Sequence, residues 1–148
     1  MYAPAVDFGR LTHVGLCVSD LERSLHFYRD LLGFEEDSSR PPLAMKGPPA
    51  AVLLELAELE LRAVYLRRDG LCLELLAYPA PGVVGDGAAR AMNRLGLTHL
   101  SFEVDAIEPL LARVRAAGGR VLEASRIPAA VFVTDPDGTR IELVQRRR

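Results

Sequence analysis

The sequence is poor in cysteine and lysine, has no tryptophan, and contains no long apolar run. No apolar stretch approaches the ~20 residues that a membrane-spanning helix needs. The opening residues, MYAPAVDFGR, lack both the basic region and the apolar region of a secretory signal. We therefore expect a cytoplasmic protein, in which the two cysteines, Cys17 and Cys72, remain free thiols.

Nearly all of the positive charge comes from arginine, because Lys46 is the only lysine, and the net charge is −2. The only basic run, residues 146–148, has no aromatic residues interleaved with it, so it is typical of a solvated tail and not of a nucleic-acid site. With 148 residues, of which 49% are apolar and 26% charged, the chain has the length and composition of one globular domain.

A short motif occurs twice, as LTHVGLCVSD at residues 11–20 and as LTHLSFEVDA at residues 97–106, a shift of 86 residues. Both copies begin with the alternation of a β-strand and continue into residues with helical spacing. The pattern predicts one helix over residues 21–32 and a second over residues 107–117, each ended by glycine.

A second repeat follows, as DGLCLELL at residues 69–76 and as DGTRIELV at residues 137–144, a shift of 68 residues. Asp-Gly between apolar runs predicts a hairpin turn, so Glu74 and Glu142 each lie on the strand that leaves such a turn. Because the two shifts differ by 86 − 68 = 18 residues, the first copy carries an insert, which we place at residues 41–58.

The repeats predict an α+β fold of two paired βαβββ modules that form a curved mixed sheet around a central site. The first module covers residues 10–78, with a short helix expected over residues 50–59 of its insert. Residues 79–96, rich in glycine, proline and alanine, form a linker with a second short helix near residues 88–95. The second module covers residues 97–146.

Each module supplies one histidine and one glutamate on predicted strands. A carboxylate among leucine, valine and isoleucine is costly unless it is paired or bound to a cation. His13, Glu74, His99 and Glu142 are therefore predicted metal ligands, and two nitrogens with two carboxylate oxygens suit Ni²⁺, Co²⁺, Zn²⁺, Mn²⁺ or Fe²⁺. His26 lies on the first predicted helix with no counterpart, so we place it outside the site.

Two further residues, Cys17 and Arg140, lie on the predicted ligand faces and could touch a substrate. A small core side chain and a charge at a strand end are the simpler interpretations of these two residues.

The segments HVGLCVSDLERSLHFYRDLLGF and FVTDPDGTRIELVQ resemble the vicinal oxygen chelate superfamily, which includes glyoxalase I, methylmalonyl-CoA epimerase, extradiol dioxygenases, fosfomycin-resistance enzymes and bleomycin-binding proteins. The resemblance covers roughly residues 10–146. In the glyoxalase I and epimerase branches it implies that His13, Glu74, His99 and Glu142 are the metal ligands. The loop before the last two strands is shorter than in glyoxalase I, and no residue is identified as a glutathione ligand.

The resulting hypothesis is a lyase, isomerase or epimerase that removes a proton next to a carbonyl of a small thiol adduct or acyl thioester. A divalent cation would stabilise the negative charge that develops, and a glutamate would move the proton, with Glu142 the first choice and Glu74 the second. Two alternatives stay open: a non-catalytic protein that binds a small molecule such as an antibiotic, and an Fe²⁺ dioxygenase. Glu74 argues against the dioxygenase, because a fourth ligand fills a position that oxygen or substrate needs.

Each module has an open sheet edge and an apolar face, so the modules can pair within one chain or between two. The superfamily resemblance implies a homodimer. We expect no membrane and no nucleic-acid partner.

Overall fold

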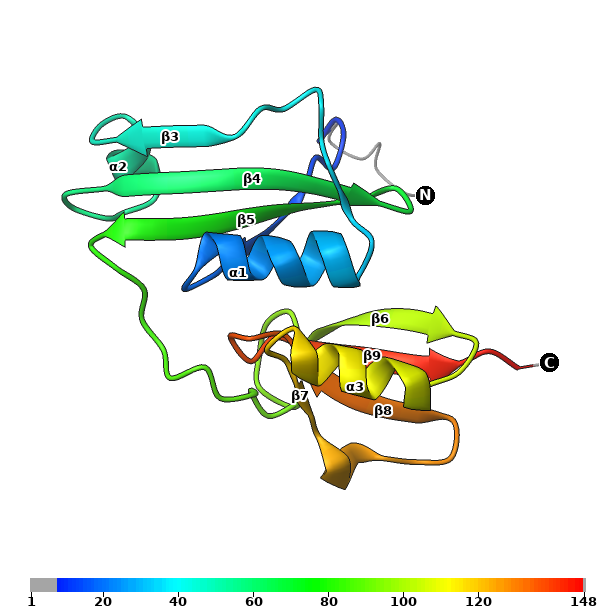
Figure 1. Cartoon of the computed structure of the whole chain (residues 1–148). Coiled ribbons are helices and arrows are strands. Elements are labelled where there is room, and N and C mark those ends of the chain that lie inside the picture. The colour runs from blue at the N-terminus through cyan, green and yellow to red at the C-terminus, as the bar shows by residue number, and fades with distance from the viewer. Residues whose placement is uncertain (1–7, 148) are drawn as a thin grey trace, which may run out of the picture.

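Each half of the chain folds into its own β-sheet in the computed structural model, which describes residues 8–147 (Figure 1). The first sheet has the strand order β1-β5-β4-β2, with β3 also paired to β4, and the second has the order β6-β9-β8-β7. The strands are β1 (Val14–Cys17), β2 (Glu35–Glu36), β3 (Leu43–Lys46), β4 (Glu60–Arg68), β5 (Leu71–Ala80), β6 (His99–Val104), β7 (Arg120–Val121), β8 (Ala130–Thr134) and β9 (Arg140–Gln145).

The predicted α+β fold of two modules is confirmed, with one difference. Both modules follow the βαβββ order, and the insert of the first module adds β3 and the short helix α2 (Ala50–Leu53). Both Asp-Gly turns are present, between β4 and β5 and between β8 and β9. Hydrogen bonding, however, divides the strands into two sheets, so one chain does not form the single curved sheet that we expected.

Three of the four predicted helices are present, and their extents differ from the prediction. The first begins as α1 (Leu21–Leu25) and continues as the π-helix η1 (His26–Leu31), and the second module carries α3 (Glu108–Ala116). The helix α2 ends early because Glu55 and Glu58 adopt positive φ angles of 54°. A short 3₁₀ helix, η2 (Glu123–Ser125), precedes β8.

The helix predicted over residues 88–95 is absent, and turns and bends occupy that part of the linker. An isolated helix of this length is marginal unless it packs against other residues, and Leu95 is 96% exposed. Gly87 and Gly96, at either end of the segment, have positive φ angles that do not continue a helix.

One hydrophobic core joins the two modules. It combines side chains of α1 and η1, such as Leu25, Phe27 and Tyr28, with Leu111 and Val114 of α3 and with one face of each sheet. Burial of this apolar surface is the main term that stabilises the pairing, at roughly 25 cal/mol per Å² removed from water. The helix-covered sheet faces therefore point into the molecule.

Alternation along the strands places the predicted ligands on the opposite faces. Leu73 and Leu75 are buried in the shared core, so Glu74 between them points away from α1. Ile141 and Leu143 enclose Glu142 in the same way on β9. No helix within residues 8–147 is long and apolar enough to cross a membrane.

Candidate metal centre

In the first module, parallel pairing of β1 with β5 brings a histidine to a glutamate. Gly15 lies opposite Glu74 in the register, and His13 is two residues before Gly15, on the same face. The Nε2 atom of His13 lies 3.0 Å from Oε2 of Glu74. The other ring nitrogen, Nδ1, is 2.8 Å from the hydroxyl oxygen of Thr12, which fixes the orientation of the ring.

The second module repeats this arrangement on β6 and β9. Ser101 lies opposite Glu142, and Nε2 of His99 is 3.7 Å from Oε2 of Glu142. The Nδ1 atom of His99 is 2.8 Å from the hydroxyl oxygen of Thr98. The sequence repeat Leu-Thr-His therefore encodes a threonine that orients the histidine, in addition to the histidine itself.

An aromatic ring and an arginine complete each His–Glu pair. The ring of Tyr65 on β4 lies edge-on to His13 with centroids 5.4 Å apart, and the guanidinium carbon of Arg40 is 5.0 Å from the Tyr65 centroid. In the second module Phe132 on β8 lies 5.3 Å from His99, and the guanidinium carbon of Arg140 is 5.4 Å from the Phe132 centroid.

The two pairs differ in the hydroxyl group that contacts the carboxylate. Glu74 accepts a hydrogen bond from Tyr65, whose pKa is raised to about 12 by burial first and by this carboxylate second. Glu142 accepts a hydrogen bond of 3.1 Å from the Ser101 hydroxyl. The side chain of Glu74 is 13% exposed and that of Glu142 is 29% exposed, so Glu74 is held more firmly.

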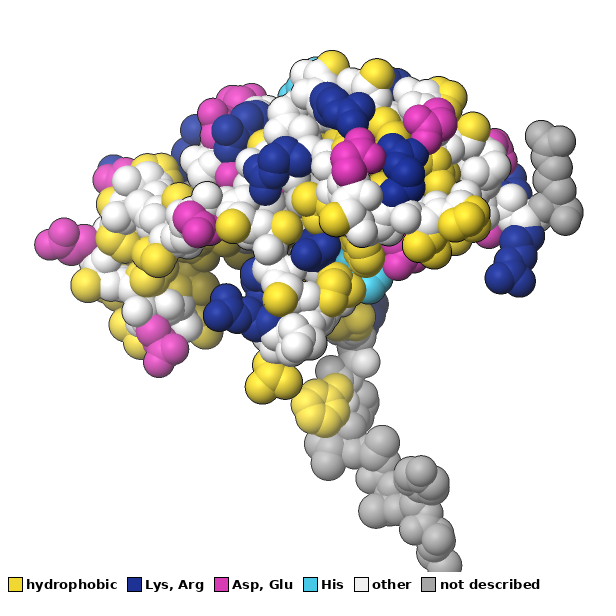
Figure 2. All heavy atoms as spheres, turned by 90° about the horizontal axis from the view of Figure 1, so that it is seen from below, with side chains coloured by type: hydrophobic (Ala, Val, Ile, Leu, Met, Phe, Trp, Pro, Cys, Tyr) yellow, Lys and Arg dark blue, Asp and Glu magenta, His cyan; other side chains and the backbone are white. Residues whose placement is uncertain are grey.

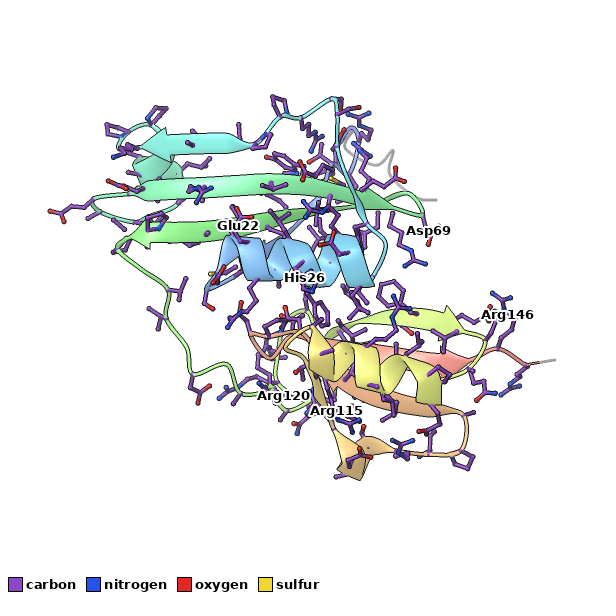
Figure 3. The ribbon with its side chains drawn as sticks, viewed as in Figure 1. Glu22, His26, Asp69, Arg115, Arg120 and Arg146 are labelled. Atoms are coloured by element: carbon purple, nitrogen blue, oxygen red, sulfur yellow. The ribbon has the colours of Figure 1, made fainter. Side chains whose placement is uncertain are left out.

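The four predicted ligands do not converge within one chain. Among residues 8–147, no three side chains of histidine, cysteine, aspartate or glutamate are placed to hold a metal ion together. His26 lies on the helix, as Figure 3 shows, and contacts Asp30 at 3.0 Å, outside both pairs as predicted. What one chain presents is two half-sites, one on each sheet.

Each half-site offers one imidazole nitrogen and one carboxylate oxygen on the same face. That donor set fits a borderline divalent cation, since both histidines are tied at Nδ1 and turn Nε2 towards the carboxylate. Two donors are too few for a tightly held ion, so an N₂O₂ site of the predicted kind needs two half-sites.

A hollow of about 490 Å³ adjoins the second half-site, between the edge strand β1 and the first residues of β6 and β9. Its walls include His99 and Arg140, together with Arg90 and the apolar residues Leu16 and Leu97. Cys17 also lines this hollow as a free thiol, and burial is the main cause that raises its pKa.

Sequence reasoning missed Arg40, Tyr65 and Phe132. The register of the two hairpins was the signal that could have found the rings, because Tyr65 pairs with Glu74 and Phe132 with Glu142 across the Asp-Gly turns. Arg40 lies in a loop, where no periodicity predicts its position.

The chain is similar in sequence and in fold to known proteins. A family model described as Glyoxalase/Bleomycin resistance protein/Dioxygenase superfamily matches residues 10–143. A lactoylglutathione lyase of Haemophilus influenzae is 28% identical over 93% of both chains.

Two solved structures share the fold. A glyoxalase family protein of Bacillus cereus has a TM-score of 0.77 at 17% identity and covers 97% of this chain and 98% of its own. A trypanothione-dependent glyoxalase I of Leishmania major has a TM-score of 0.61 at 23% identity, over 93% of this chain and 86% of its own.

Proposed function

Because the chain belongs to the glyoxalase/bleomycin resistance protein/dioxygenase superfamily, we propose that it is a metal-dependent enzyme that removes a proton next to a carbonyl group. The observation that carries this proposal is the repeated His–Glu pair, on equivalent strands and with equivalent threonine contacts. The similarity to a lactoylglutathione lyase supports a glyoxalase I type of reaction. An epimerase would begin with the same removal of a proton.

The complete site forms between two copies of the chain. Each copy carries one half-site of each kind, so a two-fold related pair can join the first half-site of one copy to the second half-site of its partner, twice. The residues that precede the two histidines support this arrangement, because Leu11 is 86% exposed and its repeat equivalent Leu97 is 77% exposed. Exposed apolar residues beside a functional site are typical of an interface.

The underside of the molecule is consistent with a protein partner. In Figure 2 apolar side chains reach the surface there, next to positively charged side chains. Arginine and apolar residues together are enriched at protein interfaces, where lysine is depleted.

His13, His99, Glu74 and Glu142 would hold the cation in this site, and Glu142 would also move the proton. A bound divalent cation supplies Lewis-acid stabilisation of the negative charge that develops on the carbonyl oxygen. Glu142 is the better base because it is more exposed than Glu74, lies farther from its histidine, and is restrained by Ser101 instead of a buried phenol. General-base catalysis of this kind contributes roughly 10²–10⁴-fold.

The place of reprotonation decides the class of enzyme. Return of the proton to the neighbouring carbon gives a glyoxalase-type lyase, and return to the same carbon from the other face gives an epimerase. We propose thiol adducts of 2-oxoaldehydes and acyl thioesters as the two substrate classes to screen.

The test is metal analysis and a substrate screen of the Glu142→Gln variant beside the wild type. We expect Ni²⁺ or Co²⁺ to bind near one ion per half-site pair in both proteins, with turnover lost in the variant. Glu103→Gln on the same sheet is the matched control and should keep full activity. Wild-type protein that binds no divalent ion would instead favour a non-catalytic binding protein.

A further inference from the structure

We propose that Arg40 and Arg140 form a two-point anion clamp across the assembled site, so that the substrate carries two carboxylates or similar anionic groups, one on each side of the reacting carbonyl. This inference rests on the proposed function for the assembly of the two half-sites. It adds a substrate class and two specificity-determining residues that the His–Glu pairs do not imply.

Arg40 is held beside the first half-site with its charge only partly compensated. Its guanidinium lies over the ring of Tyr65, and Nη1 is 3.5 Å from Nδ1 of His13. The nearest carboxylate, Asp37, is 4.0 Å from Nε, and that carboxylate is already bound by Arg67 at 2.5 Å. The side chain of Arg40 is 23% exposed, so this charge is ordered and still accessible.

Arg140 has the matching place beside the second half-site. Its Nε donates a hydrogen bond of 2.6 Å to the carbonyl oxygen of Arg90, and its guanidinium lies over Phe132. Within residues 8–147 it makes no ion pair with a carboxylate shorter than 4.0 Å, and the hollow that it lines contains no aspartate or glutamate.

The two arginines occupy equivalent places beside the half-sites but come from different elements. The sequence repeat therefore does not account for them. Arg140 opens β9, and the residue 68 positions earlier is Cys72, whereas Arg40 comes from the loop between β2 and β3. Several other arginines are paired with carboxylates, as Arg23 is with Asp137 and Arg146 with Glu103. Stacking on an aromatic ring leaves the edge of a guanidinium free, and that edge matches a carboxylate in bidentate geometry.

The experiment measures glutarate binding to the metal-free dimer by calorimetry, with the neutral diamide and butyrate as comparison ligands. We expect glutarate to bind more tightly than butyrate and the diamide not to bind. Arg40→Met and Arg140→Met keep apolar contact with the rings and should each weaken glutarate binding about tenfold, the effect of losing one charged hydrogen-bonding partner.

Arg113→Met, on the exposed side of α3, is the matched control and should bind glutarate like the wild type. Lysine at either site keeps the charge without the planar fork, so Arg40→Lys and Arg140→Lys should show intermediate affinity. If a methionine variant is unstable, the lysine variants still test whether the arginine contributes to glutarate binding.

Glutarate binding that is unchanged in the variants, or equal to butyrate binding, would overturn the clamp. Ni²⁺ titration of the same proteins keeps the two proposals separable. Normal Ni²⁺ binding with unaltered glutarate affinity would remove the clamp and leave the metalloenzyme, while arginine-dependent glutarate binding without Ni²⁺ binding would do the reverse.

Discussion

Asp135 is a fully buried carboxyl group at the junction of the two modules. Burial raises its pKa, and the hydrogen bonds that it accepts oppose that shift. The donors are the Tyr28 hydroxyl at 2.9 Å and the backbone amides of Asp137 and Thr139 at 2.9 and 2.8 Å. One side chain therefore orders the Asp-Gly turn that starts β9 and also ties this turn to the helix of the first module.

Loss of the Tyr28 hydroxyl should lower stability. The Tyr28→Phe variant leaves the buried Asp135 with one donor fewer, which costs about 1–3 kcal/mol in the free energy of unfolding. Urea denaturation measures this difference. Tyr78→Phe is the control, since the Tyr78 hydroxyl has no hydrogen-bond partner among residues 8–147, and equal stability of both variants would contradict the role of the Asp135 contact.

Asp37 is a second buried carboxyl group, and its pKa is shifted in the opposite direction from that of Asp135. Hydrogen bonds from Ser39 and the contact with Arg67 lower its pKa from 3.8 to about 2 in the folded protein, against the effect of burial. The ionised form therefore stabilises the fold above about pH 3.8, and this contribution is lost as the pH falls through about 2.

The Asp37→Asn variant should remove that contribution. We expect its melting temperature to fall less steeply than that of the wild type between pH 4 and pH 2, followed by circular dichroism. The exposed Asp69→Asn variant is the control. Parallel curves for wild type and Asp37→Asn would show that the Ser39 and Arg67 contacts do not act on stability.

At the scale of elements, the sequence pattern predicted the features that depend on residues close together along the chain. The Asp-Gly turns and the alternation around Glu74 and Glu142 set the hairpin register and therefore the faces of the strands. The π-helical continuation of the first helix and the early end of α2 depend on packing and on two unusual backbone angles, which periodicity does not contain.

For the candidate site, the sequence predicted each His–Glu pair but not the separation of the two pairs or the position of Arg40. Each histidine was predicted to share a module with its glutamate, and parallel pairing of the first and last strand of each module makes them neighbours. That the two pairs stay apart within one chain depends on how the modules pack, and Arg40 depends on a loop, so neither followed from spacing along the sequence.

Gly119 lies in a crowded place, where the second module packs against the first helix of the chain. A Cβ atom there would lie 2.3 Å from the carbonyl oxygen of Thr134 and 2.9 Å from the ring of Phe27. Gly119→Ala should destabilise the protein by about 3 kcal/mol, the upper part of the range for overpacking, as measured by chemical denaturation.

Gly47→Ala separates this steric effect from backbone strain. Gly47 has a φ of 58° and open space around its Cα, so alanine there costs about 1 kcal/mol of left-handed strain alone. A Gly119→Ala variant no less stable than Gly47→Ala would mean that Thr134 and Phe27 move aside at little cost.

At the scale of the whole molecule, the shared core fixes the directions in which the half-sites face. Because the helix-covered faces of both sheets are buried together, the His–Glu faces remain available to a second copy. The same packing that stabilises one chain therefore leaves each proposed metal site half complete within that chain.

Mixing two inactive variants tests this arrangement directly. His13→Ala destroys the first half-site of a chain and His99→Ala the second, so neither homodimer keeps an intact site. In a mixed dimer, the intact first half-site of the His99→Ala chain meets the intact second half-site of the His13→Ala chain. Random exchange makes half of the dimers mixed, each with one intact site of two, which restores about one quarter of the wild-type Ni²⁺ sites.

Equilibrium dialysis with Ni²⁺ before and after mixing measures this recovery. The control mixes His13→Ala protein with a His13→Ala/His99→Ala double variant, in which no dimer contains an intact site. Recovery in the first mixture alone requires ligands from two chains, because a site built within one chain stays broken in both variants however they are combined. Absence of recovery after verified subunit exchange would contradict a site shared between two chains.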